Sequence, residues 1–250
     1  MDVYSPKWAD PRIALSFSSR RRFRCIAARR RHQLRSAFEL VYDRYYREGL
    51  TAWNRHGMRI VPHQLLDTSW VLIAERGAVP LGTLSVIEDG AMGLPMEQLY
   101  PAEIWRLRQS NVRLAELACF ALQDRCEKQS MTVLRTLLRT ACEIGIREHI
   151  DELVICVHPK RSRFYARCMG FEVFGAVQYC PWACGHPAIP MKLTLQADSP
   201  ATDAIARLSA HSQSFLSLIE PESIHCDDRA FFWRLLDQAE NLPSDCRMAA

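Results

Sequence analysis

Residues 158–171 read His-Pro-Lys-Arg-Ser-Arg-Phe-Tyr-Ala-Arg-Cys-Met-Gly-Phe. Pro159 is suited to the first turn of a helix, and Gly170 is suited to the left-handed residue that ends one. The apolar run at residues 153–157 before this segment and the run at 172–175 after it both read as strands. The segment therefore predicts the helix of a β-α-β unit.

The rest of the chain alternates strand-like and helix-like patterns. Further strands are predicted at residues 22–27, 70–75, 81–87, 111–122 and 188–195. Helices are predicted at residues 30–48, 95–109 (one or two short ones, broken at Pro101), 132–146, 204–219 and 228–239. Residues 50–69 and 179–187 read as loops. This order predicts an α/β fold with a mixed central sheet and helices on both faces.

The chain divides into three parts by pattern. Residues 1–19 look irregular, and residues 20–197 contain all the predicted strands. A Ser-Pro pair at 199–200 marks a boundary, so residues 198–250 read as a helical C-terminal extension. We expect a chain truncated near Ala197 to fold.

The composition is that of a folded soluble protein. Of the 250 residues, 48% are hydrophobic and 24% are charged, and no apolar run is long enough to span a bilayer. The first residues lack the order of a signal peptide, and the ten cysteines are irregularly spaced. We therefore expect a cytoplasmic protein with reduced thiols.

Arginines crowd residues 20–35, although the net charge is only +4. Such a cluster can attract nucleic acid, anionic lipid or an acidic protein, or it can be a solvated face without a partner. Because no nucleic-acid-binding motif accompanies the cluster, we do not expect nucleic acid as a partner.

The 158–171 segment also carries a spacing of aromatic residues. Pro159 is followed after four residues by Phe164 and Tyr165, and after four more by Gly170 and Phe171. This pattern resembles the fourth helix of the GNAT superfamily of N-acyltransferases, in which the tyrosine often lies beside the thioester sulfur. An ordinary β-α-β connection with a core Phe-Tyr pair is the alternative.

A lone carboxylate, Glu116, lies within the apolar run 112–122. Burying a carboxylate is costly unless it is paired or used, so Glu116 is a candidate general base with a raised pKa. The alternative is a structural ion pair with Arg113 or Arg44.

The strand around Glu116 is similar to one in acyl-homoserine-lactone synthases and long-chain (FeeM-like) N-acyl amino acid synthases. Their pattern is Glu, two small residues, Arg, an aromatic residue or Leu, and two apolar residues. Glu116, Phe120 and Leu122 fit it, whereas Cys119 replaces the Arg and Ala118 the usual Ser. That departure puts any role of the Arg in doubt, but not the role of the Glu.

The resemblance to the FeeM-like synthases covers about residues 20–197. Residues 38–49 match F-x-L-x-Y-x-x-Y-x-x-E-G, and residues 93–97 match G-L-P-x-E/D. Residues 81–85 match G-T-x-R without its Arg, and residues 105–108 are similar to the short helix before the Glu116 strand.

The resemblance implies a GNAT-like acyltransferase fold that transfers a long-chain acyl group from a thioester to the amine of an amino acid. Glu116 would take the amine proton, and Tyr165 would assist the leaving thiolate. Backbone N–H groups of Ala118, Cys119 and Phe120 would hold the oxyanion of the acyl donor. No tightly bound cofactor is implied, because the acyl-phosphopantetheine thioester is a co-substrate.

The donor and the acceptor are also suggested by the resemblance. Residues 123–130 contain no glycine, whereas CoA-binding GNAT enzymes usually carry a Gly-rich pyrophosphate loop there. Acyl carrier protein, which is acidic and would meet Arg125 and Lys128, is therefore favoured over acyl-CoA. We expect the acceptor to contact residues from three separate parts of the chain: Arg44, Asp67 and Trp182.

Other readings stay open. Cys180, Cys184 and His186 could suggest zinc, but their spacing is loose and a fourth ligand is missing, so no metal is expected. The chain could be a CoA-dependent acetyltransferase, an acyl-homoserine-lactone synthase, or a non-catalytic GNAT-like binding module.

Overall fold

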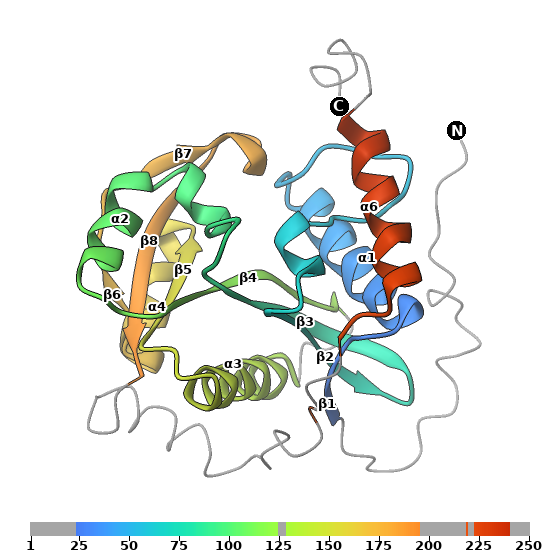
Figure 1. Cartoon of the computed structure of the whole chain (residues 1–250), viewed down its shortest axis with the longest axis horizontal. Helices are drawn as coiled ribbons and strands as arrows, with labels where there is room; N and C mark the ends of the chain where they lie inside the picture. Colours follow the sequence, from blue (N-terminus) through green and yellow to red (C-terminus); the bar gives the residue numbers. More distant parts are fainter. Residues whose placement is uncertain (1–23, 125–128, 196–218, 220–222, 241–250) are drawn as a thin grey trace.

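A computed structural model describes residues 24–124, 129–195, 219 and 223–240. Its centre is an eight-stranded mixed sheet in the order β1-β2-β3-β4-β5-β8-β6, with β7 paired to β8 (Figure 1). The strands are β1 (Arg24–Ala27), β2 (Ser69–Arg76), β3 (Val79–Glu88), β4 (Leu114–Leu122), β5 (Glu152–Val157), β6 (Glu172–Val173), β7 (Gln178–Cys180) and β8 (His186–Thr194). Of these pairs, β4–β5 is parallel and the others are antiparallel.

The described part of the chain also contains longer helices and three short 3-10 helices. The longer ones are α1 (Arg31–Arg47), α2 (Pro101–Gln109), α3 (Ser130–Arg147), α4 (Pro159–Met169) and α6 (Cys226–Glu240). The short ones are η3 (Pro62–Leu65), η4 (Pro95–Gln98) and η6 (Pro181–Ala183). None of the described helices is long and apolar enough to cross a membrane.

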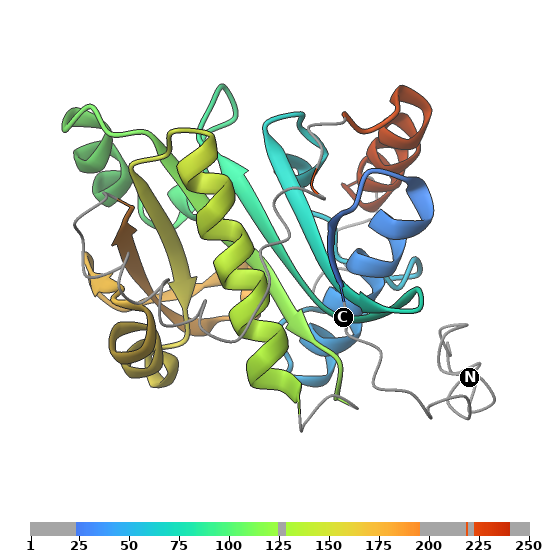
Figure 2. The same ribbon diagram turned by 90° about the horizontal axis from the view of Figure 1, so that it is seen from below.

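Helices cover both faces of the sheet, as predicted. The alternation along β2 shows this directly, because Leu72 belongs to the buried cluster under α3 whereas Val71 and Ile73 belong to the cluster under α1. Seen from below, α3 crosses one face of the sheet, and α1 lies behind the other (Figure 2). The predicted GNAT-like α/β architecture is confirmed.

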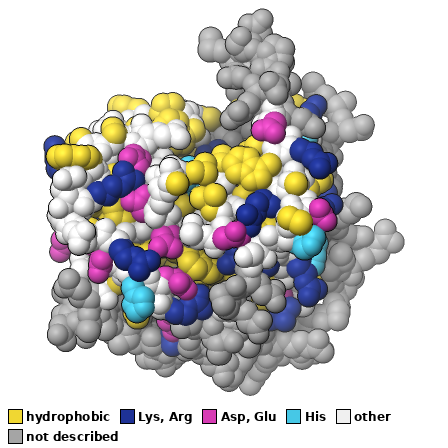
Figure 3. Space-filling model, in the orientation of Figure 1, with side chains coloured by type: hydrophobic (Ala, Val, Ile, Leu, Met, Phe, Trp, Pro, Cys, Tyr) yellow, Lys and Arg dark blue, Asp and Glu magenta, His cyan; other side chains and the backbone are white. Residues whose placement is uncertain are grey.

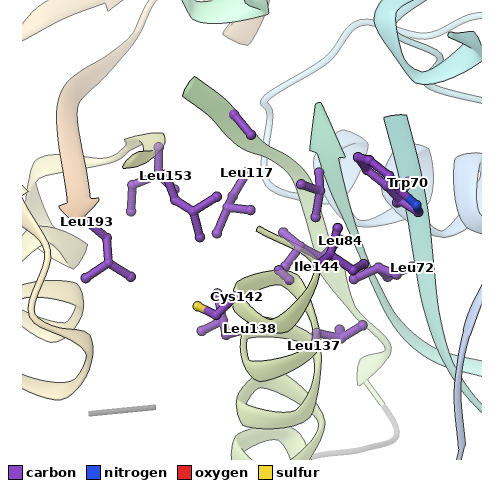
Figure 4. Packing of buried hydrophobic residues seen from close by; sticks show 14 of the residues in the cluster. Trp70, Leu72, Leu84, Leu117, Leu137, Leu138, Cys142, Ile144, Leu153 and Leu193 are labelled. Carbon is purple, nitrogen blue, oxygen red and sulfur yellow. The ribbon is translucent and has the colours of Figure 1, made fainter. Parts of the chain in front are cut away.

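The main core lies between the sheet and α3 (Figure 4). The apolar side of α3 meets leucines from successive strands. They are Leu84 of β3, Leu117 of β4, Leu153 of β5 and Leu193 of β8, facing Leu137, Leu138 and Ile144 of α3. Burying one such side chain stabilises the fold by about 1.5–3 kcal/mol, so this layer holds both halves of the sheet to one helix.

The segment at residues 158–171 folds as its sequence predicts. The backbone N–H of Lys160 donates to Nδ1 of His158, which caps the start of α4. Gly170 ends the helix with a φ of 78°, in the left-handed region that glycine adopts without strain. Helix α4 therefore connects β5 to β6, and its length is set by the proline and the glycine.

The loop prediction for residues 179–187 is wrong. These residues contain the end of β7, the η6 turn and the start of β8, which pair as an antiparallel hairpin. Residues 50–69 also contain η3, and the strand predicted at 172–175 is limited to Glu172–Val173. The helix predicted at 204–219 lies outside the described residues except for Ile219, which is buried.

Helix α6 packs on α1 on the face opposite to α3 (Figures 1 and 2). Phe232 is fully buried, and its ring meets the Phe38 ring edge-on at 5.2 Å between centroids. The side chain of Arg31 pairs with Asp228 at 2.8 Å. This helix therefore covers core surface, although the proposed boundary at residue 198 stays a prediction.

Candidate active site

Strands β4 and β5 part in the middle of the sheet. Their pairing runs from Leu114 with Glu152 to Leu117 with Ile155 and ends there. Residues 118–122 continue along β3 alone, and residues 156–157 continue along β8 alone. Figure 1 shows the two halves of the sheet diverging from this point. The edge of β4 beyond Leu117 thus has no strand on its β5 side.

A β-bulge lies beside this opening. The pairing of β3 with β4 shifts between Thr83 and Ser85, so that Cys119 and Phe120 lie opposite one residue of β3. Cys119 has a φ of 52°, which residues other than glycine rarely adopt, and strained backbone of this kind gathers at functional sites. The bulge takes backbone groups of Cys119 and Phe120 out of the regular ladder.

Glu116 lies in β4 just before the strands part. Its side chain is buried, and Oε2 accepts a hydrogen bond of 2.8 Å from the backbone N–H of Met96. Burial raises the pKa of Glu116 to about 8, and the Met96 N–H acts in the opposite, weaker sense. A carboxylate with this pKa is a stronger base than an ordinary one, and the ionised form that can accept a proton from an amine becomes abundant as the pH approaches 8.

The arginines that could have neutralised Glu116 have other partners. Arg113 pairs with Glu88 at 2.8 Å, and Arg44 pairs with Glu48 at 2.5 Å and with Asp124. The structural alternative for Glu116, an ion pair with Arg113 or Arg44, is therefore not what the structure contains.

Tyr165 lies on α4, which directly follows β5. Its ring meets those of Phe164 and Phe171 edge-on, at 5.4 and 5.9 Å between centroids. Burial raises the pKa of the Tyr165 phenol above its usual value, and Arg161 opposes this shift. The hydroxyl is thus protonated at neutral pH and can donate a proton or a hydrogen bond.

A family model described as the N-acyl amino acid synthase FeeM matches residues 36–194, more than half of the chain. The chain belongs to the FeeM family of N-acyl amino acid synthases. It is accordingly an N-acyltransferase, for which the family implies an acyl thioester as donor and an amino acid as acceptor. Curated protein sequences give no match.

Solved structures agree with this family. The structure of FeeM, an N-acyl amino acid synthase from uncultured soil microbes, is 27% identical with a TM-score of 0.55, over 64% of this chain and 83% of that chain. The CoA-dependent acyl-homoserine lactone synthase BjaI is 14% identical with a TM-score of 0.56, over 84% and 97%. A putative N-acetyltransferase from Lactobacillus plantarum is 14% identical with a TM-score of 0.51, over 70% and 100%. The last two show a shared fold.

One residue near the bulge at Cys119 was not among the predicted site residues. Arg59, in the connection between α1 and η3, donates from Nη2 to the backbone carbonyl of Trp182 at 3.1 Å. Its guanidinium also lies over the Tyr45 ring, at 5.2 Å from the centroid. Arg59 thus links the right half of the molecule in Figure 1 to the β7–β8 hairpin of the left half. The unusual length and polarity of residues 50–69 were the available signal.

The three residues expected to contact the acceptor lie in different surroundings. Arg44 holds Asp124, and Asp67 pairs with Arg229 of α6. Trp182 is partly exposed at the η6 turn, and its carbonyl is the group that Arg59 holds. Trp182 is thus linked to Arg59, whereas Arg44 and Asp67 have ion-pair partners of their own.

The residues expected to contact the acyl donor fall into two groups. Ala118, Cys119 and Phe120 lie at the bulge, as described above. Arg125 and Lys128 lie outside the described residues, between β4 and α3. Their proposed contact with the donor stays a prediction.

The two cysteines of the possible zinc set, Cys180 and Cys184, lie in different surroundings. Cys180 is buried in an apolar cluster, whereas Cys184 is exposed. Within the described part of the chain, the ligand atoms of His225, Cys226 and Asp227, at the exposed start of α6, come within 4.8 Å of one another. Exposed groups of this kind are common without an ion.

Proposed function

We propose that this FeeM-family enzyme transfers a long-chain acyl group from an acyl carrier protein thioester to the amine of an amino acid, with Glu116 as the general base. The observation that carries the proposal is the position of this buried carboxylate. It lies on the face of β4 opposite to α3, one residue before β4 leaves β5 and three residues before the bulge. A family match over residues 36–194 supports the reaction class.

The reaction follows from these groups in three steps. The neutral amine of the acceptor attacks the thioester carbonyl, and ionised Glu116 accepts the proton that the nitrogen loses as the bond forms. Backbone N–H groups at Cys119 and Phe120 stabilise the oxyanion that forms. The C–S bond breaks as the amide forms, and the leaving thiolate takes a proton from the hydroxyl of Tyr165.

The donor follows from charge and from the missing glycines. Backbone N–H groups of a Gly-rich loop hold a pyrophosphate closely, and residues 123–130 lack such glycines. The same segment carries Arg125 and Lys128, which suit an acidic carrier protein. Acyl-CoA remains the second candidate donor, since both carry the same phosphopantetheine thioester.

The test is product analysis with the purified protein. The protein is incubated with a long-chain acyl carrier protein thioester and a mixture of amino acids, and the extract is examined by mass spectrometry. The proposal predicts N-acyl amino acids that form in proportion to enzyme and time. Thioester hydrolysis without any amide product would contradict it.

A further inference from the structure

Arg59 is connected to the surroundings of Glu116 through two sets of contacts. Cys119 packs in one buried cluster with Tyr45, over whose ring the Arg59 guanidinium lies. On the other side, Arg59 holds Trp182, two residues after Cys180, which shares a buried cluster with Met96. Met96 donates to Glu116, and Cys119 follows Glu116 in β4. Both sets of contacts therefore connect the guanidinium with the surroundings of the carboxylate.

The electrostatics agree with this placement. Burial raises the pKa of the Cys119 and Cys180 thiols, and among the smaller influences the charge of Arg59 lowers both pKa values whereas that of Glu116 raises them. The two thiols thus lie within range of both charges. Among the ion pairs of the described residues, none joins Arg59 to Glu116, so the guanidinium does not neutralise the carboxylate directly.

The guanidinium has donors left for a ligand. A guanidinium carries five N–H groups, and the described contacts use two of them, to Trp182 and, at 3.2 Å, to Oγ1 of Thr51. Nε is buried and has no hydrogen-bond partner among the described residues. A buried donor without a partner is costly, and the two remaining Nη N–H groups are the donors left for a ligand.

We infer that Arg59 binds the α-carboxylate of the acceptor amino acid, while Glu116 faces its α-amine. The inference rests on the proposed function. A carboxylate binds an arginine through two parallel N–H donors, which makes the pair strong and directional. An amino acid held between the two charges presents its amine to the base, whereas an amine without a carboxylate lacks the anchor. Arg59 is thus a residue that determines specificity for amino acids over simple amines.

Trp182, whose carbonyl Arg59 holds, is exposed, and so is Trp53 of the connection that carries Arg59. Figure 3 shows hydrophobic side chains gathered on the face between the two halves, with Lys and Arg side chains near them.

The experiment is a competition between an amino acid and the amine with the same side chain. Equimolar L-tyrosine and tyramine, L-phenylalanine and phenethylamine, or L-leucine and isoamylamine are offered with one acyl thioester. The ratio of the two amide products, measured by mass spectrometry, is independent of the amount of active enzyme. Wild-type protein is compared with Arg59→Met and Arg59→Lys, and with Arg55→Met, an exposed arginine on the same connection, as control.

We expect wild type and Arg55→Met to favour the amino acid by tenfold or more. Arg59→Met should reduce this ratio by about 10- to 100-fold, the range expected for a lost charged hydrogen bond. Arg59→Lys should give an intermediate ratio and raise KM for the amino acid but not for the amine.

An unchanged product ratio in Arg59→Met would overturn the inference, and so would a wild-type enzyme without preference for the amino acid. In either case, amide formation by wild type would still support the proposed function. Amide formation from neither acceptor by wild type would end both. If Arg59→Met is inactive, equal changes in KM for both acceptors in Arg59→Lys would overturn the inference.

Discussion

Glu116 is a carboxyl group that folding keeps protonated near neutral pH. In an unfolded chain its pKa is about 4.3, whereas burial raises it to about 8 in the folded state. Between these values the folded state holds a proton that the unfolded state has released. The stability of the wild-type protein therefore falls as the pH rises through this window.

This linkage predicts a stabilised Glu116→Gln variant. Gln can still accept from the Met96 N–H but does not titrate. Relative to wild type, the variant should gain about 2–5 kcal/mol in free energy of unfolding between pH 4.5 and about 8. Urea unfolding of both proteins across this pH range measures the difference in their free energies of unfolding. The other titrating groups are the same in both proteins, so their contributions cancel in this difference. A difference that does not change with pH would show that Glu116 is ionised in the folded protein.

Tyr165 allows a separate test of the leaving-group step. Tyr165→Phe removes the hydroxyl and keeps the edge-on contacts with Phe164 and Phe171. Because a thiolate is a good leaving group, we expect kcat to fall by about 10- to 100-fold, at or below the lower limit typical of general acid catalysis. The melting temperature should change little. Turnover equal to that of wild type would remove Tyr165 from the mechanism.

Among whole elements, those with strong local signals were predictable. Helix α4 has a proline at its start and a glycine at its end, and α3 has a regular apolar face, so both were found. Strand β7 has only three residues and is followed by a proline and a turn. A strand of this length is too short for an alternation of polar and apolar residues to be recognised. The packing of α6 on α1 joins residues almost 200 positions apart, and no local pattern carries such a contact.

Within the candidate site, too, residues with local sequence signals were predictable and those defined by tertiary contacts were not. Glu116 and Tyr165 were found because a charge in an apolar strand and an aromatic pair in a β-α-β helix are local signals. Arg59 was missed because its importance comes from its contacts with Tyr45 and Trp182, which only the tertiary fold brings near. The bulge at Cys119 was also invisible, since its register depends on β3.

Helix α6 should be required for stability, in contrast to the expectation from its place after a Ser-Pro boundary. Phe232→Ala leaves a cavity against Phe38, and we expect a loss of about 3–5 kcal/mol in free energy of unfolding. Arg234→Ala, an exposed change on the same helix, should stay within about 0.5 kcal/mol of wild type. Chemical denaturation of the full-length variants measures both. If both variants were equally stable, α6 would not contribute to the core and would be a dispensable extension.

For the molecule as a whole, the charge distribution predicts the donor. Arg125→Glu with Lys128→Glu should raise KM for the acyl carrier protein thioester, and the effect should shrink at high salt because screening weakens long-range attraction. Arg234→Glu, on α6, serves as the control with the same type of charge change. Initial rates over a range of ionic strengths measure the effect. Equal rates with acyl carrier protein and CoA thioesters in wild type would overturn the choice of donor.

The proposed mechanism, with a carboxylate base where β4 and β5 separate, depends on Glu116. The direct measurement is turnover of wild type and Glu116→Gln, with saturating acyl thioester and amino acid and with the melting temperature taken on the same preparations. Loss of a general base costs about 10²–10⁴ in rate, so the variant should melt no lower than wild type at pH 8 and lose turnover by this factor. A Glu116→Gln variant that turns over at the wild-type rate would contradict the mechanism.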